Sequence, residues 1–186
     1  ECNPEGLVQF GRMGAVFARD RLGVKEPRIA LLSIGEEPGK GSPFAKNAHG
    51  RLTEAKFEGA RFIGNVEGRD LLTDAADVVV TDGFTGNVAL KTLEGGLKTL
   101  MTSLLTALSV RQEAAEAARI LGPELDGLYQ QFHPDTYGGA ILLGVQGVCV
   151  ISHGSSNALA VENAVALAAE MVDADVVGHL TGAVAD

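Results

Sequence analysis

Residues 77–87 read DVVVTDGFTGN, a β-branched run that ends on a turn and leads into a long helical stretch. A strand that is apolar on both faces is typical of a sheet covered by helices on each side. The helix after the turn is expected from about Gly86 to Leu108. This strand–turn–helix unit predicts an α/β fold.

The same alternation of helix and strand continues on both sides of this unit. Asn3 and Pro4 suit the cap and the first turn of a helix over 4–22. Ser42 and Pro43 suit the same positions in a second helix, which is expected to end near residue 56. Further strands are expected over 28–34 and 61–63, with one or two more over 140–145 and 147–151. Further helices are expected over 66–72, 111–132 (interrupted at 122–123) and 155–172. The order predicts a three-layer α/β/α sandwich with a mostly parallel sheet, in a single domain, 1–186.

Composition limits the class of protein. Hydrophobic residues make up 46% of the chain but aromatic residues only 5%, so the core must be built from Val, Leu, Ile and Ala. The net charge of -9 disfavours binding to nucleic acid. No apolar run reaches the ~18 residues of a transmembrane helix, and no signal peptide is recognised. Cys2 and Cys149 form no disulfide framework, so a reduced, cytoplasmic setting is expected.

Three junctions share one design, in which an apolar strand is followed by a turn rich in Gly or Ser and then by a helix. They read IGEEPGKGS (34–42), TDGFTGN (81–87) and ISHGSSN (151–157). Such turns lie at the carboxyl ends of parallel strands, where free N–H groups and helix N-termini attract anions. We therefore predict a phosphate-handling crevice whose phosphate- or substrate-binding residues are Gly39, Gly41, Ser42, Asp82, Gly86, Ser155, Ser156 and Asn157.

Three further side chains are candidates for catalysis, and each has a plainer alternative. Lys40 lies between two glycines and can reach a bound anion, or it is a solvated surface lysine. His153 follows a strand and is either an acid–base group or a hydrogen-bonded structural histidine. Asn87 is either a ligand contact or a helix cap. Asp82, likewise, either orients a catalytic group or caps its turn.

Several other kinds of site are excluded by spacing. The first junction lacks the G-x-x-x-x-G-K-[ST] pattern of ATP-binding loops, and no G-x-G-x-x-G for a dinucleotide is present. No metal site and no cofactor is expected, because the four histidines are scattered. Cys149 lies in a predicted strand, where it is expected to pack as a small hydrophobic residue rather than to act as a nucleophile.

The helix that begins near Gly86 carries an apolar stripe at positions 97, 100, 101, 104, 105 and 108. The stripe predicts a core or dimer-interface helix. A lipid-contacting hairpin tip around Leu108 to Val110 is the alternative. Residues 97–133 are therefore expected to form a helical hairpin at a dimer or membrane surface.

Five strings together resemble one known family in their order and spacing. They are IGEEPGKG (34–41), FIGNVEGRD (62–70), ADVVVTDGFTGNVALKTLEG (76–95), YGGAILLGVQG (137–147) and ISHGSSNA (151–158). The sequence resembles the phosphate acyltransferase family of fatty acid and phospholipid synthesis. The resemblance covers residues 2–172 and implies that the chain is the C-terminal part of such an enzyme, a little over half of it, without the N-terminal part.

The resemblance implies a fold related to phosphotransacetylases and to isocitrate and isopropylmalate dehydrogenases. It implies a cytoplasmic homodimer with peripheral contact at the inner face of the membrane, which moves a long-chain acyl group from acyl-carrier-protein to inorganic phosphate and releases acyl phosphate. Residues 111–132 are acidic here, where relatives are often Lys-rich, and this disfavours docking of the acidic carrier at that stretch. The alternatives are a short-chain phosphotransacetylase that uses acetyl-CoA and a non-catalytic fragment that binds the carrier or a membrane.

Overall fold

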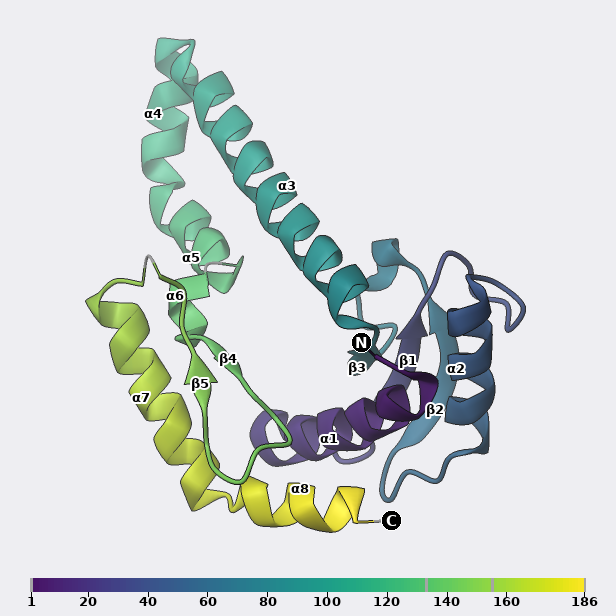
Figure 1. The fold of residues 1–186 in the computed structure, drawn as a ribbon. Coiled ribbons are helices and arrows are strands. Elements are labelled where there is room, and N and C mark those ends of the chain that lie inside the picture. The colour runs from purple at the N-terminus through teal and green to yellow at the C-terminus, as the bar shows by residue number, and fades with distance from the viewer. Residues whose placement is uncertain (1, 133, 155, 186) are drawn as a thin grey trace. The chain divides into compact units, whose positions relative to one another are not determined.

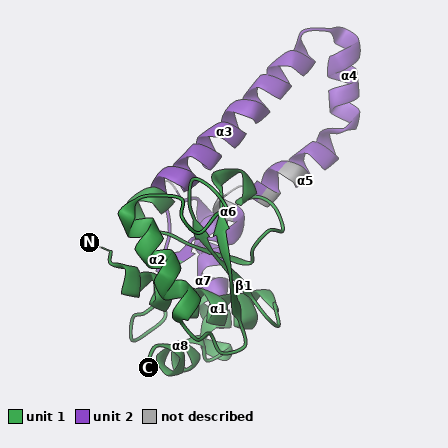
Figure 2. Cartoon of the chain, turned by 90° about the vertical axis from the view of Figure 1, so that its right-hand side faces the viewer, with its two compact units in different colours: residues 1–86, 141–149, 168–186 green, residues 87–140, 150–167 purple. Residues whose placement is uncertain are grey.

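The computed structural model describes residues 2–132, 134–154 and 156–185 and has an α/β fold (Figure 1). Its elements are α1 (Pro4–Leu22), β1 (Arg28–Leu32), α2 (Pro43–Glu54), β2 (Arg61–Val66), the 3-10 turn η1 (Gly68–Asp70), β3 (Val78–Val80), α3 (Gly83–Ser109), α4 (Gln112–Ile120), α5 (Gly122–Phe132), α6 (Pro134–Tyr137), β4 (Ala140–Ile141), β5 (Val150–Ile151), α7 (Ala158–Asp173) and α8 (Val176–Val184). The chain divides into two compact units (Figure 2): unit 1 comprises residues 1–86, 141–149 and 168–186, and unit 2 comprises 87–140 and 150–167.

Unit 1 is built on a three-stranded sheet with the order β2-β1-β3. β1 pairs in parallel with both neighbours. The parallel sheet predicted from the apolar runs is thus confirmed, although it is small. Parallel order brings the carboxyl ends of the three strands to one edge, and the chain leaves β1 and β3 for α2 and α3 at that edge.

The first helix begins and ends as its sequence predicts. The side-chain oxygen of Asn3 accepts a hydrogen bond of 2.7 Å from the Gly6 N–H, and Pro4 occupies the first turn. Gly23 ends α1 in the left-handed region, with φ 70°. α1 packs against β1, β3, α2 and α8. A Cβ added at Gly14 would lie 2.5 Å from a methyl carbon of Val78, so the glycine allows α1 to approach β3 closely.

The core of unit 1 is aliphatic, as the composition predicted. Leu7, Ile29 and Leu52 are fully buried, and Leu31 is nearly so. Further buried members of the same cluster are Val8, Ala15, Ala48 and Val80. α1, β1, α2 and β3 all contribute to it, so this cluster fixes the elements that carry the first two junctions.

The strands near the end of the chain are much shorter than predicted. β4 and β5 pair with each other over two residues each, in place of strands over 140–145 and 147–151. Turns and bends occupy 143–147, where Gly144 has φ 85°. Cys149 therefore lies outside any strand and is exposed, so the prediction that it packs as a buried hydrophobic residue is wrong.

Helix boundaries follow the sequence more closely. An interruption was predicted at 122–123, and the break lies one residue earlier, at Leu121: α4 ends at Ile120 and α5 begins at Gly122. Two helices were not predicted. One is the short α6, and the other is α8, whose Gly178 and Gly182 lower its helix propensity. Buried Val176 and Leu180 nevertheless hold α8, which packs against α1.

Candidate functional site

The β1–α2 loop, residues 33–42, ends in a capped helix. The Ser42 Oγ accepts a hydrogen bond of 3.2 Å from the Ala45 N–H, and Pro43 follows at the first helical position, as predicted. A hydroxyl that accepts in this way keeps its own hydrogen for donation. Within the described residues, no acceptor is bonded to the backbone N–H groups of residues 39, 41, 42 and 44. The loop therefore offers several donors beside a helix N-terminus, which is the arrangement that favours an anion.

Gly41 is required by the geometry of this loop. Its φ of 94° lies in a region that residues with a Cβ rarely adopt. A Cβ added there would also lie 2.8 Å from the Ala45 Cβ and 3.0 Å from the Ser33 Oγ. The Ser33 Oγ is buried and has no hydrogen-bond partner in the described part of the chain. Gly41 thus lets the backbone pass close to both side chains at the start of α2.

Lys40 is exposed at the tip of the loop. Its Nζ lies 3.9 Å from a Glu37 carboxylate oxygen, a loose ion pair, and half of its side chain is accessible. The Lys40 N–H donates to the Glu37 carbonyl oxygen at 3.0 Å, which closes a turn over residues 37–40. The backbone at Lys40 is therefore fixed while its ammonium group can still move, as an anion-binding lysine requires.

At the second junction Asp82 caps α3. Its carboxylate accepts from the Thr85 N–H at 3.0 Å and from the Thr85 hydroxyl at 2.6 Å. The hydrogen bond from the Thr85 hydroxyl, followed by that from its N–H, lowers the pKa of Asp82. The capping role is thus the one that the geometry shows. The Gly86 N–H donates to the Asp82 carbonyl oxygen at 2.9 Å, so it is already engaged within the helix.

The first two junctions line one pocket in unit 1, of about 230 Å³. Its polar lining comes from Ser33, Gly41 and Ser42 on one side and from Thr81, Asp82 and Thr85 on the other. Its apolar lining is formed by Leu7, Leu31, Leu32, Ile34, Phe44 and Ala45. Of the predicted site residues, Gly41, Ser42 and Asp82 line this pocket together, whereas Gly39, Lys40 and Gly86 are not among the described residues that line it.

The third junction belongs to unit 2 and is capped in the same manner. The Asn157 side-chain oxygen accepts from the Ala160 N–H at 2.9 Å, which makes Asn157 the cap of α7. The Ser156 N–H donates to the His153 carbonyl oxygen at 3.0 Å. Ser155, a predicted site residue, lies outside the described residues. Asn87, which was also predicted as a site residue, belongs to the first turns of α3 and is exposed.

A second pocket, of about 240 Å³, lies within unit 2. His153 and Ser156 line it, as do Glu94, Tyr137, Gly138, Gly139, Ala140, Ile151 and Ala160. Neither Glu94 nor Tyr137 was predicted from the sequence as a site residue. The signal that could have found Tyr137 is the pair of glycines that follows it.

The two glycines allow close backbone packing in this pocket. Gly138 has φ 76° and Gly139 has φ 151°. A Cβ added at Gly138 would overlap the backbone of α7 at Asn163 and Ala164, and one at Gly139 would lie 2.5 Å from the Ile151 carbonyl oxygen. The Ser152 hydroxyl donates to the Gly138 carbonyl oxygen at 2.7 Å. These contacts hold the strand ends of unit 2 against the middle of α7.

Two kinds of feature are absent from the described residues. None of their helices is long and apolar enough to cross a membrane. Among the same residues, no three His, Cys, Asp or Glu side chains gather in a way that could hold a metal ion.

Known proteins resemble this chain along its whole length. The model of a family described as "Fatty acid synthesis protein" matches residues 1–179. The phosphate acyltransferase of Desulforudis audaxviator is 44% identical over 186 residues, which cover 100% of this chain and 55% of that protein. The phosphate acyltransferases of Geobacillus sp. (strain WCH70) and Bacillus licheniformis are 46% and 44% identical and are covered over 55% and 54% of their length. The chain spans about half the length of the curated relatives it matches.

Proposed function

Because the chain belongs to the fatty acid synthesis protein family, as its motifs predicted, we propose that it carries part of the active site of a phosphate acyltransferase. The proposed reaction moves a long-chain fatty acyl group from the thioester of acyl-carrier-protein to inorganic phosphate, and the acyl phosphate product serves phospholipid synthesis. The single observation that carries the proposal is the unit 1 pocket, in which two of the predicted junctions meet. The proposed full architecture is a three-layer α/β/α sandwich of the isocitrate dehydrogenase-like type.

In this proposal the β1–α2 loop binds phosphate. The N–H groups of Gly39, Gly41 and Ser42 and the Ser42 hydroxyl are the donors, and the Lys40 ammonium group supplies the positive charge. Positive charge is needed because the loop itself carries the carboxylates of Glu36 and Glu37, and the carboxylate of Asp82 lines the pocket. Without Lys40 they would repel a phosphate dianion.

The chemistry is direct transfer between the two substrates. A phosphate oxygen attacks the thioester carbonyl carbon, the carbonyl oxygen becomes an oxyanion, and the C–S bond then breaks to give acyl phosphate and a thiolate. The Asn87 amide, or the N–H of Ser155, is proposed to donate to the oxyanion. One such donor is worth about 3 kcal/mol of barrier. Gly86 is a poorer donor, since its N–H is already bonded to Asp82. His153 is proposed to protonate the leaving thiolate.

The helical segment over 97–133 is proposed as a surface for a second copy of the chain or for the membrane. Among the described residues of α3 none is buried, and Leu100 and Leu104, four residues apart, are 64% and 38% exposed. Exposed leucines at helical spacing favour an apolar partner. The acidic side chains of α4 and α5, such as Glu113 and Glu124, disfavour docking of the acidic carrier there.

The donor specificity tests the proposed function. The protein assayed is a full-length phosphate acyltransferase whose matching region is residues 1–186 of this chain. It is supplied with phosphate and with either long-chain acyl-carrier-protein or acetyl-CoA. A strong preference for the carrier-bound long chain supports the proposal. A preference for acetyl-CoA would favour a short-chain phosphotransacetylase. A protein that turns over neither donor, yet binds the carrier or liposomes, would favour a non-catalytic fragment.

A further inference from the structure

β2 contains a bulge opposite Ile29 and Ala30 of β1. Ile29 of β1 lies opposite Phe62, but Ala30 lies opposite Gly64, so that Ile63 is an extra residue on β2. Gly64 has φ 107°, in the region that favours glycine. A Cβ added at Gly64 would meet no atom within 4 Å. The glycine is therefore required by its backbone conformation and not by lack of space.

The bulge changes the direction of the next side chain. In a regular strand, residues 62 and 65 face opposite sides of the sheet. Here both contact His49 of α2: its ring meets the Phe62 ring edge-on at 5.3 Å between centroids, and its Nδ1 lies 2.9 Å from the Asn65 Oδ1. An extra residue re-aims the side chains that follow it. The bulge thus turns Asn65 toward α2.

Asn65 is the only buried polar or charged residue among those that the structure describes, with 8% of its surface exposed. Its Nδ2 donates to the Glu37 carbonyl oxygen at 2.9 Å. The same oxygen accepts from the Lys40 N–H, the bond that closes the 37–40 turn. One buried amide therefore links α2, through His49, to the turn that presents Lys40.

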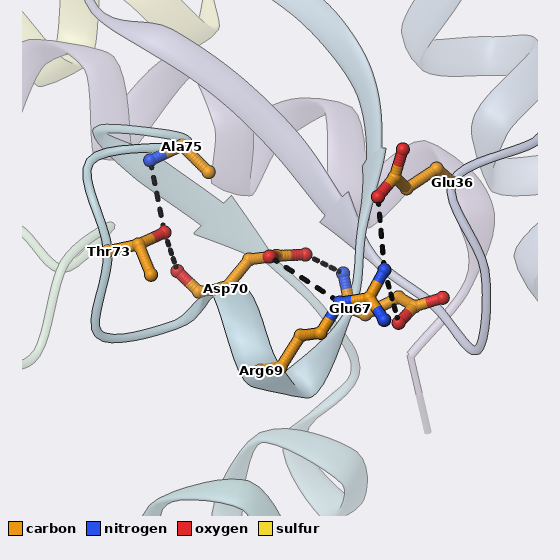
Figure 3. A network of polar contacts seen from close by, with 6 residues as sticks. All are labelled: Glu36, Glu67, Arg69, Asp70, Thr73 and Ala75. Atoms are coloured by element: carbon orange, nitrogen blue, oxygen red, sulfur yellow. Dashed lines mark hydrogen bonds and ion pairs between the residues drawn. The ribbon is translucent and has the colours of Figure 1, made fainter.

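Arg69 makes a second link to the neighbouring residue of the loop (Figure 3). Its guanidinium lies 3.3 Å from a carboxylate oxygen of Glu36 and 3.2 Å from one of Glu67. Arg69 is 69% exposed, and ion pairs at that exposure add little stability. The buried amide of Asn65 is therefore a stronger attachment of the 37–40 turn than this ion pair is.

We propose that Asn65, turned by the Gly64 bulge and backed by His49, is a positioning residue for the phosphate site. It holds the 37–40 turn in place before phosphate arrives, so that less ordering is required on binding. The inference rests on the proposed function, in which the β1–α2 loop binds phosphate. The role of Asn65 is indirect, since its side chain contacts the loop backbone and not the substrate.

A double-mutant cycle in the full-length enzyme tests this role. Asn65→Ala is expected to raise KM for phosphate about tenfold, because a small misplacement of a binding group is costly. The kcat and the KM for the acyl donor should stay within about twofold. If Asn65 acts through the turn, Asn65→Ala adds little to Lys40→Ala, whereas independent effects would multiply. Asn47→Ala, an exposed change on α2, is the matched control. An unchanged KM for phosphate, or multiplying effects, overturns the proposal.

Two further measurements keep the test decisive. If Asn65→Ala does not fold, His49→Ala replaces it in the cycle. His49→Ala is also expected to raise KM for phosphate, and an unchanged KM again overturns the proposal. If the parent enzyme forms no acyl phosphate, the proposed function fails. Hydrogen exchange at the Lys40 N–H then tests whether Asn65 holds the 37–40 turn in place. Exchange about tenfold faster in Asn65→Ala supports the role, and unchanged exchange contradicts it.

Discussion

Arg28 and Asp77 form a two-pronged ion pair that joins the start of β1 to the residue before β3. The guanidinium donates to the two carboxylate oxygens at 2.9 and 3.1 Å. The Arg28 N–H donates to the same carboxylate at 2.8 Å, and the Asp77 N–H donates to the Arg28 carbonyl oxygen at 3.0 Å. The pair therefore fixes the parallel register of the two strands that carry the first two junctions.

This pair predicts a pH dependence of stability. The hydrogen bond from the Arg28 side chain, followed by that from its N–H, lowers the pKa of Asp77. A lowered folded-state pKa stabilises the fold fully above the unfolded value, about 3.9, and the gain is lost as the pH falls through the folded value. Asp77→Asn should therefore lower the free energy of unfolding at pH 7 and should lose less further stability than the parent on acidification.

Urea unfolding between pH 7 and pH 3 checks this prediction. Glu58→Gln, an exposed change in unit 1, is the control and should follow the parent throughout. The pKa of Asp82 is also lowered, and Asp82 is still present in the Asp77→Asn variant. The variant is therefore expected to keep part of the loss of stability on acidification. Equal loss of stability on acidification in Asp77→Asn and the parent would contradict the account.

The aliphatic core predicts a large difference between two leucines. Leu31 is 2% exposed at the centre of the sheet, and Leu31→Ala should cost about 2–5 kcal/mol. Leu72 is 55% exposed, and Leu72→Ala should change the free energy of unfolding by no more than about 0.5 kcal/mol. Similar losses for the two variants in urea unfolding would show that Leu31 does not lie in the core of unit 1.

Two glycines of one loop should respond differently to the same substitution. Gly41→Ala imposes a strained backbone and close contacts with Ser33 and Ala45, so it should cost about 1–3 kcal/mol. Gly39→Ala is the control, because a Cβ at Gly39 meets nothing within 4 Å. It should be neutral or slightly stabilising. Chemical unfolding of both variants decides, and equal stabilities would argue against the described loop.

A similar comparison tests unit 2. Gly138→Ala would push a Cβ into the backbone of α7 and should destabilise the chain by at least about 1–3 kcal/mol. Gly95→Ala, at an open position within α3, should stabilise it by about 0.5–1 kcal/mol. Thermal or urea unfolding measures both. Opposite signs are expected, and a stabilising Gly138→Ala would rule out the close approach to α7.

Much of unit 1 could be predicted because its signals are local. Asn3 and Pro4 begin α1, and Ser42 and Pro43 begin α2. The valines of β3 have a high propensity for β-strands. These signals depend on neighbours within one turn of helix or one strand. The meeting of two junctions in one pocket then follows from the parallel order of the strands.

What could not be predicted depends on long-range contacts. α8 contains two glycines and forms because Val176 and Leu180 are buried, with α1 as its packing partner. The role of Asn65 depends on the bulge and on His49, which lies 16 residues before it. A glycine inside an apolar strand hints at a bulge, and this was the available signal at Gly64. It gave no indication that Asn65 reaches the Glu37 carbonyl oxygen.

The most direct test of the central claim is trapping of acyl phosphate with hydroxylamine. The full-length enzyme is supplied with long-chain acyl-carrier-protein, with and without phosphate, beside its Lys40→Ala variant and a Lys46→Ala control. Lys46 is exposed on α2, outside the β1–α2 loop. Phosphate-dependent product that falls at least about tenfold in Lys40→Ala, and not in Lys46→Ala, is the expected result. A folded enzyme that gives no phosphate-dependent product, or a Lys40→Ala variant as active as the parent, would contradict the account.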